Sequence, residues 1–469
     1  MHAMKRMLLL IVISLGFSTP NIFATPATMR LDYYHSGKVG QETFSLDRIV
    51  VEPLPWPGDP GKNVDDSNLG NYFFEVDDTA SGRTLYSRAF NSIYGEWITT
   101  DEAKSMDRTF SESLRFPAPT VPVHVLLKSR SAGESGFHEV WSVDINPHDK
   151  FIDTSRPPSP GPLLKIQQSG DSITKVDLLV LGDGYTAAER AKFEQDAHRF
   201  ADMLFSTSPF REHRNDFNVW GLCPPADESG ISRPSTGVHR RNPLGTTYDT
   251  FDTERYILTT NNRALRDVAS YAPYEFIEIL VNDQTYGGGG IFNLYATVAI
   301  DSEWAGYVGV HEFGHHFAAL ADEYYTSPVA YTPASQKSEP WEPNVTALLN
   351  PGKLKWRDLV APGTPLPTPW RKDEFESYER DIQKQRRQLR AANRPESEMN
   401  NLFRHEAQRE ETLLKSDQYS GTVGAFEGAD YEAHGYYRPE ENCIMFTRYA
   451  QFCAVCRRAI ERIIAMYAS

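Results

Sequence analysis

The segment His311-Glu312-Phe313-Gly314-His315 combines residue types and a spacing that can hold a metal ion beside a general base. On a helix, residues four positions apart share one face, so the imidazoles of His311 and His315 can converge on one divalent cation while Glu312 projects beside it. The alternative is a core helix whose histidines are satisfied internally. Three histidines and one glutamate within six residues are unusual in such a helix, because every buried polar group needs a partner. We therefore expect His311 and His315 to bind Zn²⁺ and Glu312 to act as the catalytic base.

The segments before this motif predict the elements that position it. Residues 176–181 form an apolar run typical of a buried strand, and the turn after them leads into a helix capped by Thr186. A further helix is predicted over residues 253–270 and a second buried strand over 276–281. The glycines at 287–290 and the run that follows them predict a strand bordering the cleft, to which an extended peptide can add through backbone hydrogen bonds. A bare loop is the alternative.

The N-terminal part of the chain has a different pattern. Short alternating runs bounded by Gly, Pro and Asp predict an antiparallel β-sandwich over residues 25–150. Its aromatic residues either form the sandwich core, the commoner case, or line a glycan- or protein-binding surface; they are Trp56, Tyr86, Phe90, Tyr94 and Trp97. A Pro- and Ser-rich stretch within residues 151–165 predicts a linker, which leaves residues 166–469 as a second, catalytic domain.

Residues 371–415 interrupt the second domain with a strongly charged segment. Apolar residues at helical spacing, a break at Pro395 and a second polar run predict an inserted helical hairpin. We interpret its charges as a solvated face rather than a binding surface, and we expect the hairpin to contribute little to the main core.

Composition and the first residues limit the partners and the compartment. A formal net charge of -15 argues against a nucleic-acid partner, which usually requires a basic stripe. Lys5 and Arg6 precede an apolar run and small residues, so residues 1–24 predict a cleaved signal peptide and export to the periplasm, the cell surface or the medium. No other stretch is long and apolar enough to predict a transmembrane segment after the signal is removed.

Four cysteines remain to be explained in an exported chain, namely Cys223, Cys443, Cys453 and Cys456. An even number in an oxidising compartment predicts structural disulfides first. A structural zinc site is the alternative, because Cys453 and Cys456 have the spacing of a metal knuckle, although no second pair of cysteines matches it.

Taken together, the sequence from His311 to Tyr324, the preceding glycine run and Cys443-Ile444-Met445 resemble the M64 peptidases, which are secreted zinc proteases similar to immunoglobulin A peptidases. The N-terminal part resembles the β-sandwich domain that accompanies this family. The resemblance implies an α+β, metzincin-like zincin domain, with a twisted sheet over the active-site helix and Met445 beneath the metal. The chain departs from ordinary metzincins because it lacks the glycine and the third histidine that follow their motif.

The third zinc ligand is assigned to Asp322 from this resemblance. Seven residues separate it from His315, so on a continuous helix their backbones would lie about 10 Å apart, although a zinc–carboxylate bond is only about 2 Å. The helix must therefore end or bend back near Leu320, where no glycine is available for a C-cap. Glu323 and His434 remain alternatives.

These residues predict a secreted zinc-dependent endopeptidase that acts on a protein or peptide substrate. Glu312 would take a proton from zinc-activated water and pass it to the leaving amine, and Tyr324, Tyr436 or Tyr437 would stabilise the oxyanion. The competing predictions are a non-catalytic secreted glycan- or protein-binding protein and a zinc hydrolase of other amides or esters. An intact Glu312 favours the enzyme over the binder.

Overall fold

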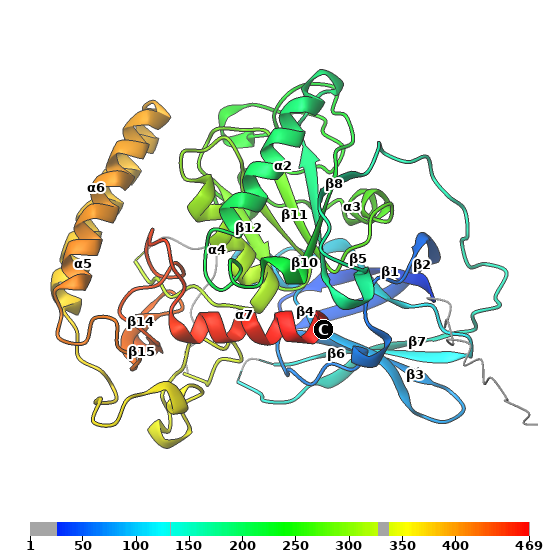
Figure 1. Cartoon of the computed structure of the whole chain (residues 1–469), viewed down its shortest axis with the longest axis horizontal. Coiled ribbons are helices and arrows are strands. Elements are labelled where there is room, and N and C mark those ends of the chain that lie inside the picture. Colours follow the sequence, from blue (N-terminus) through cyan, green and yellow to red (C-terminus); the bar gives the residue numbers. More distant parts are fainter. Residues whose placement is uncertain (1–25, 132, 327–336, 469) are drawn as a thin grey trace, which may run out of the picture.

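Two antiparallel sheets form the N-terminal part of the computed structural model, which describes residues 26–131, 133–326 and 337–468 (Figure 1). One sheet has the order β2-β1-β5 and the other β4-β3-β6-β7. The strands are β1 (Ala27–Lys38), β2 (Gln41–Pro55), β3 (Tyr72–Asp78), β4 (Thr84–Phe90), β5 (Arg108–Pro117), β6 (Val123–Ser129) and β7 (His138–Ile145). Alternate residues of β5 and β6 are buried, and side chains of both sheets share one hydrophobic core. The predicted antiparallel N-terminal sheets are therefore confirmed.

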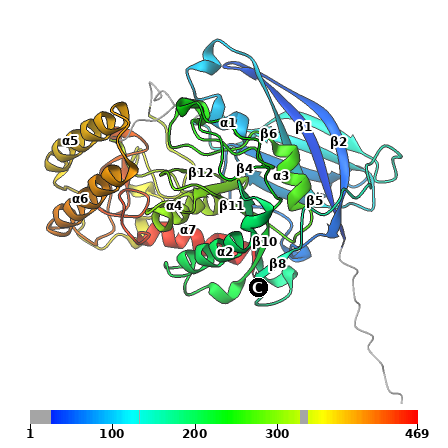
Figure 2. The same cartoon turned by 90° about the horizontal axis from the view of Figure 1, so that it is seen from above.

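The aromatic residues of this part are buried rather than displayed. The five aromatics singled out in the sequence are all less than a tenth exposed; they are Trp56, Tyr86, Phe90, Tyr94 and Trp97. Two of them, Tyr94 and Trp97, belong to the short helix α1 (Ile93–Trp97) and pack in the same core as Leu179 and Ile277 of the C-terminal part. The N-terminal part is thus packed directly against the rest of the molecule (Figure 2).

A six-stranded sheet of order β12-β13-β11-β9-β10-β8 is the centre of the C-terminal part. Its strands are β8 (Leu164–Gln167), β9 (Val176–Asp183), β10 (Phe217–Leu222), β11 (Phe276–Val281), β12 (Gly288–Ile291) and β13 (Tyr295–Ala299). The four central strands are parallel, and the edge strands β8 and β12 are antiparallel to their neighbours. Every residue of β9 and β11 is buried because both faces of the sheet are covered, which explains their unbroken apolar sequence.

Helices cover this sheet on both faces. On one face α2 (Arg190–Leu204) and α4 (Ala305–Ala318) pack into one core with Leu178 and Val180, and the C-terminal helix α7 (Ala454–Tyr467) packs against α4. On the other face α3 (Asn262–Ala269) packs against Leu179 and Leu181. The amphipathic helices therefore bury their apolar faces on the sheet, and α4 carries the histidine motif along it.

The helix predicted over residues 253–270 is wrong in its first half. Only α3, Asn262–Ala269, is helical, and Asn261 caps it by accepting a hydrogen bond from the backbone of Ala264. The chain before it runs beside the glycine strand, where the Ile257 N–H donates to the carbonyl oxygen of Gly288 at 3.3 Å. Tertiary hydrogen bonds outweigh the local helix propensity there.

Residues 371–415 contain the two long helices α5 (Lys372–Ala391) and α6 (Glu396–Lys415), which stand at one end of the molecule (Figure 1). The expectation that they contribute little to the main core is wrong. Phe375, Ile382 and Phe403 belong to the largest hydrophobic core, and Phe403 is fully buried. The reason is that the inner face of the pair carries apolar residues such as Phe375, which packs against Phe446, while Lys372 at its start is hydrogen-bonded to Glu427 in the hairpin of β14 (Phe426–Ala429) and β15 (Glu432–Arg438). Most of the pair's charges lie on the outer face, although Glu379, Glu406 and Glu410 are buried.

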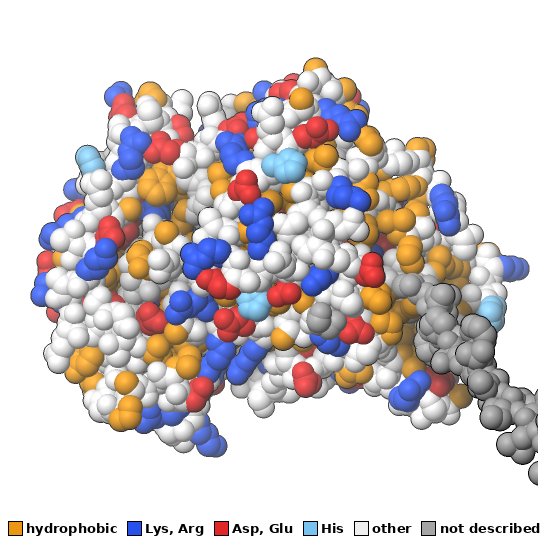
Figure 3. All heavy atoms as spheres, in the orientation of Figure 1, with side chains coloured by type: hydrophobic (Ala, Val, Ile, Leu, Met, Phe, Trp, Pro, Cys, Tyr) orange, Lys and Arg blue, Asp and Glu red, His pale blue; other side chains and the backbone are white. Residues whose placement is uncertain are grey.

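The predicted signal peptide, residues 1–24, lies outside the described residues. Within the described parts of the chain, no helix has the length and the apolar character to cross a bilayer. On the face drawn in Figure 3, acidic and basic side chains are interspersed.

Candidate active site

Helix α4 brings the imidazoles of His311 and His315 together on one face. Their Nε2 atoms lie 3.1 Å apart, and Glu312 belongs to the same cluster of side-chain ligand atoms. The helix fits closely on the sheet because the strand beneath it is made of glycine: a Cβ at Gly290 would lie 2.1 Å from the carbonyl oxygen of Glu312. The glycine run thus allows the motif to lie directly against β12.

Asp322 reaches the two histidines because the helix ends abruptly after Ala318. Ala319 takes a left-handed conformation with φ 55° and ψ 32°, and the N–H of Leu320 donates back to the carbonyl oxygen of Gly314. This is the closure usually made by glycine, here made by alanine. The turn reverses the chain, so that Oδ1 of Asp322 lies 2.9 Å from Nε2 of His311 and 3.2 Å from Nε2 of His315.

Backbone carbonyl groups fix the orientation of both imidazoles. Nδ1 of His311 donates to the carbonyl oxygen of Ile444 at 2.9 Å, and Nδ1 of His315 donates to that of Leu320 at 2.5 Å. With the proton on Nδ1, each Nε2 presents a lone pair toward the other and toward Asp322. Met445, beside Ile444, is fully buried, and its sulfur lies 3.2 Å from where a Cβ of Gly314 would be.

The donor set fits a divalent cation. Oδ2 of Asp322 accepts a hydrogen bond from the hydroxyl of Tyr431, whereas Oδ1 is buried without a hydrogen-bond donor among the described residues. When both imidazoles are neutral, three acceptors therefore converge in a buried place, an arrangement that a positive charge between them stabilises. Burial disfavours the imidazolium form of His315, but the carboxylates of Asp322 and Glu312 outweigh it and raise the pKa of His315 to about 9. Burial likewise opposes ionisation of Asp322, yet the two imidazoles hold the pKa of its carboxyl well below the usual range.

The other candidates named from the sequence lie elsewhere. Glu323 points to the opposite side of the chain, where its Oε1 lies 3.3 Å from the sulfur of Cys456, and His434 is exposed beside Glu427. His316 is fully buried: its Nδ1 donates to the carbonyl oxygen of Ile291 at 3.0 Å, and its Nε2 accepts from the N–H of Ile277 at 3.1 Å. Burial lowers the pKa of His316 to about 3, so this imidazole is neutral.

Of the three candidate oxyanion residues, only Tyr324 lines the cleft at the motif. Its ring is stacked 6.2 Å from the ring of His311, and its hydroxyl accepts a hydrogen bond from Arg255 at 2.9 Å. Tyr436 packs in a small separate core with Ala321, and Tyr437 pairs through its backbone with Thr346.

A cleft of about 250 Å³ lies in front of the motif and is lined by both parts of the chain. The strand β12 supplies Gly289 and Gly290, and α1 of the N-terminal part supplies Gly95 and Glu96. Glu96 is partly buried, and burial raises the pKa of its carboxyl to about 7. The imidazolium of His315 opposes this rise. A larger cavity of about 920 Å³ adjoins the cleft and shares Arg255 with it.

Sequence reasoning missed Tyr431, Arg255 and Glu96. Each lies more than 50 positions from the motif, and no local pattern links it to the motif. Tyr431 follows a tight turn at Asp430, where two consecutive residues have positive φ, and this turn directs its hydroxyl to Asp322. No signal in the sequence marks Arg255: its backbone pairs with Gly288 only in the fold, and the predicted helix at 253–270 placed it elsewhere.

Two protein-family models match the sequence of the chain. The sequence model described as IgA Peptidase M64 matches residues 164–464, and the one described as Peptidase M64 N-terminus matches residues 21–142. The first covers more than half of the chain and contains the motif, the glycine run and all four cysteines. No curated protein matches the chain.

Proposed function

Because the chain belongs to the M64 peptidase family, we propose that it is a zinc-dependent endopeptidase whose centre is built by His311, His315 and Asp322. The observation that carries the proposal is the convergence of two Nε2 atoms and one carboxylate oxygen within 2.9 to 3.2 Å of one another. Imidazoles with a carboxylate are typical ligands of catalytic zinc. When bound, zinc would polarise the scissile carbonyl and make a water molecule acidic near neutral pH.

Glu312 is the general base in this proposal. It follows His311 directly, is buried, and belongs to the same cluster as the two imidazoles. From there its carboxylate accepts the proton of the attacking water and returns it to the leaving amine. The hydrogen bonds from Nδ1 of both histidines to backbone carbonyl groups keep the imidazoles oriented during this transfer.

Arg255 and Tyr324 are proposed to stabilise the oxyanion. The guanidinium donates to the tyrosine hydroxyl, which leaves the hydroxyl proton free to point into the cleft over His311. Burial raises the pKa of the Tyr324 hydroxyl, and the neighbouring guanidinium of Arg255 opposes this rise.

The substrate is proposed to be an extended peptide. The edge strand β12 borders the cleft with Gly289 and Gly290, and an edge strand offers backbone hydrogen bonds to an added strand. Residues 255–257 already pair with Gly288, so the added strand is proposed to pair with β12 beyond Gly288. The adjoining cavity of about 920 Å³ lengthens the cleft beyond what a small amide or ester needs. We further propose that residues 1–24 export the chain, so that the substrate is extracellular or periplasmic.

The test combines metal analysis with cleavage. The purified protein should cleave casein or a quenched peptide, lose this activity in a chelator and regain it with Zn²⁺. The Glu312→Gln variant should retain zinc and lose roughly 10²-fold or more of turnover, because the base is removed and the ligands remain. Glu303→Gln, a change at an exposed glutamate just before α4, serves as the matched control. Undiminished cleavage by metal-free protein would overturn the proposal, and ester but not peptide cleavage would replace the peptidase by another zinc hydrolase.

A further inference from the structure

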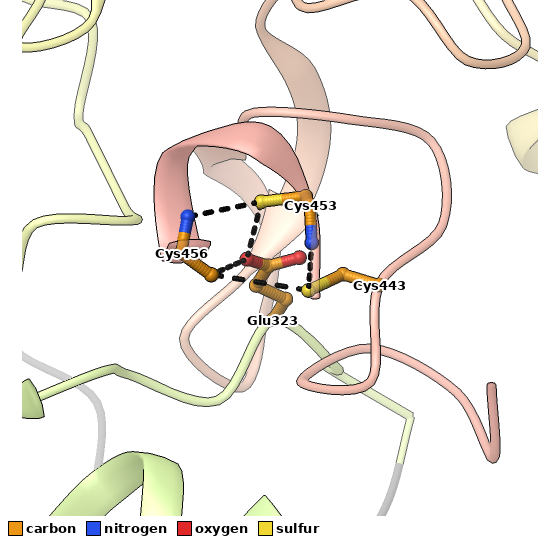
Figure 4. Close-up of side chains that lie close together, drawn as sticks. All are labelled: Glu323, Cys443, Cys453 and Cys456. Carbon is orange, nitrogen blue, oxygen red and sulfur yellow. Dashed lines mark hydrogen bonds between the residues drawn. The ribbon is translucent and has the colours of Figure 1, made fainter. Parts of the chain in front are cut away.

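Three of the four cysteines meet around one carboxylate (Figure 4). Cys443, Cys453 and Cys456 lie with Glu323 in a cluster separate from the site of His311 and His315. All four side chains are buried, and Glu323 is fully so. Cys453 and Cys456 come from the start of α7, Cys443 from the loop before it and Glu323 from the segment after α4. The predicted disulfides are wrong for this structure, because all four cysteines of the chain are free thiols.

The distances in this cluster match a tetrahedron around zinc rather than a disulfide. The sulfurs of Cys443 and Cys456 lie 3.8 Å apart, whereas a disulfide requires about 2.05 Å. With zinc–sulfur bonds of about 2.3 Å, the edge of a regular tetrahedron between two sulfurs is about 3.8 Å, and an edge between sulfur and oxygen is about 3.5 Å. Oε1 of Glu323 lies 3.3 Å from the sulfur of Cys456 and 4.0 Å from that of Cys453, on both sides of this value.

Backbone N–H groups point at two of the three sulfurs. The N–H of Cys453 points at the sulfur of Cys443 at 3.3 Å, and the N–H of Cys456 points at the sulfur of Cys453 at 3.4 Å. Backbone donors at the N-terminus of a helix stabilise negatively charged sulfur. The carboxylate also lacks a full set of partners: Asn344 donates to Oε1 at 3.0 Å, but Oε2 is buried without a hydrogen bond among the described residues.

We propose that Glu323, Cys443, Cys453 and Cys456 bind a structural zinc ion, distinct from the ion of the active site. Three thiolates and a carboxylate form a closed four-ligand set without an open position for substrate, which is typical of structural rather than catalytic zinc. Soft sulfur ligands favour zinc over calcium or magnesium. The set carries a formal charge of -2 with the ion in place, and the fully buried guanidinium of Arg438, which acts electrostatically on Glu323 and Cys443, offsets part of it.

This second ion would hold the two segments that position the active site. The ligand Glu323 follows Asp322, and its N–H donates to the carbonyl oxygen of Met445 at 2.8 Å. The ligand Cys443 precedes Ile444, whose carbonyl oxygen orients His311. An ion bound to both segments ties the turn carrying Asp322 to the loop beneath α4. In an oxidising compartment it also protects the three thiols from oxidation.

Metal counting on purified, full-length protein tests the proposal. The wild type should hold about two zinc ions per chain, and the Cys456→Ser variant about one. The His311→Ala/His315→Ala double variant should also hold about one, and this count does not depend on peptidase activity, so it stands whether or not the proposed function is correct. Cys223→Ser, which removes the one cysteine outside the cluster, should keep two.

Cobalt exchange covers the case in which Cys456→Ser does not fold. In the double histidine variant, bound Co²⁺ should give a thiolate-to-cobalt charge-transfer band, which only sulfur ligands produce. A double variant without metal and without this band would overturn the proposal. The proposal would also be overturned if alkylation of the denatured, unreduced protein left two of the three clustered cysteines unmodified. That result would show a disulfide in place of the ion.

Discussion

Replacing Tyr431 by phenylalanine should weaken zinc binding at the active site without disturbing the fold. The hydroxyl of Tyr431 donates to Oδ2 of Asp322, and this bond directs Oδ1 toward Nε2 of both His311 and His315. The phenylalanine ring keeps the edge-on contact that Tyr431 makes with Tyr324 at 5.3 Å. The substitution therefore removes the hydrogen bond and preserves the packing.

The size of the effect follows from the burial of Asp322. A hydrogen bond to a charged group is worth about 1.5–3 kcal/mol, and about 1.4 kcal/mol corresponds to a factor of ten. Zinc affinity should thus fall roughly 10- to 100-fold, the range usual for a group that orients a metal ligand. An opposing effect is that a carboxylate without its donor is more basic. This effect is minor at neutral pH, because the imidazoles of His311 and His315 hold the pKa of Asp322 well below its ordinary range.

Zinc add-back measures this affinity at the active site alone. Metal-free protein is titrated with zinc buffered at known free concentrations, and peptidase activity reports occupancy of the catalytic site. Tyr437→Phe is the matched control, since Tyr437 lies on β15 and outside the lining of the cleft. If Tyr431→Phe and Tyr437→Phe both require the same free zinc as the wild type, the orienting role of Tyr431 is refuted.

Three further predictions concern the third ligand and the helical hairpin. Asp322→Ala should keep the fold and weaken zinc strongly, whereas His434→Ala should bind zinc as the wild type does; the reverse result in the same titration would transfer the ligand role to His434. Burial and the neighbouring Glu406 raise the pKa of Glu379 to about 7, so the folded protein keeps a proton that the unfolded chain releases above its ordinary pKa of 4.5, and stability should fall as the pH rises between these two values. Glu379→Gln should reduce this fall, although other buried carboxyls such as Glu96 contribute to it, and should add roughly 1–3 kcal/mol to the free energy of unfolding above about pH 8, measured by denaturant titration across that range. Deleting residues 371–415 should cost more than about 3 kcal/mol, the amount for one buried phenylalanine such as Phe403, and an unchanged melting temperature would contradict the packing of the hairpin in the main core.

Local sequence alone determined the elements whose signal repeats over neighbouring residues. The spacing of His311 and His315 predicts one helical face because 3.6 residues make a turn, and α4 has that geometry. The unbroken apolar runs at 176–181 and 276–281 predict buried strands, and β9 and β11 lie there, covered on both faces. The alternation of residues in the N-terminal part likewise predicts antiparallel sheets, because side chains of a strand point to opposite faces in turn.

Tertiary structure decided everything that depends on residues far apart in the sequence. The turn at Ala319 contradicts its helix-forming neighbours, and it forms because Ala321 and Asp322 find partners outside the helix: the side chain of Asn344 bonds both backbone groups of Ala321, and the N–H of Asp430 donates to the carbonyl oxygen of Asp322. Helix propensity amounts to less than about 1 kcal/mol per residue, so a few such bonds outweigh it. The gathering of Cys443, Cys453 and Cys456 around Glu323 has the same origin: 120 positions separate Glu323 from Cys443, and only the packing of α7 against α4 brings them into contact.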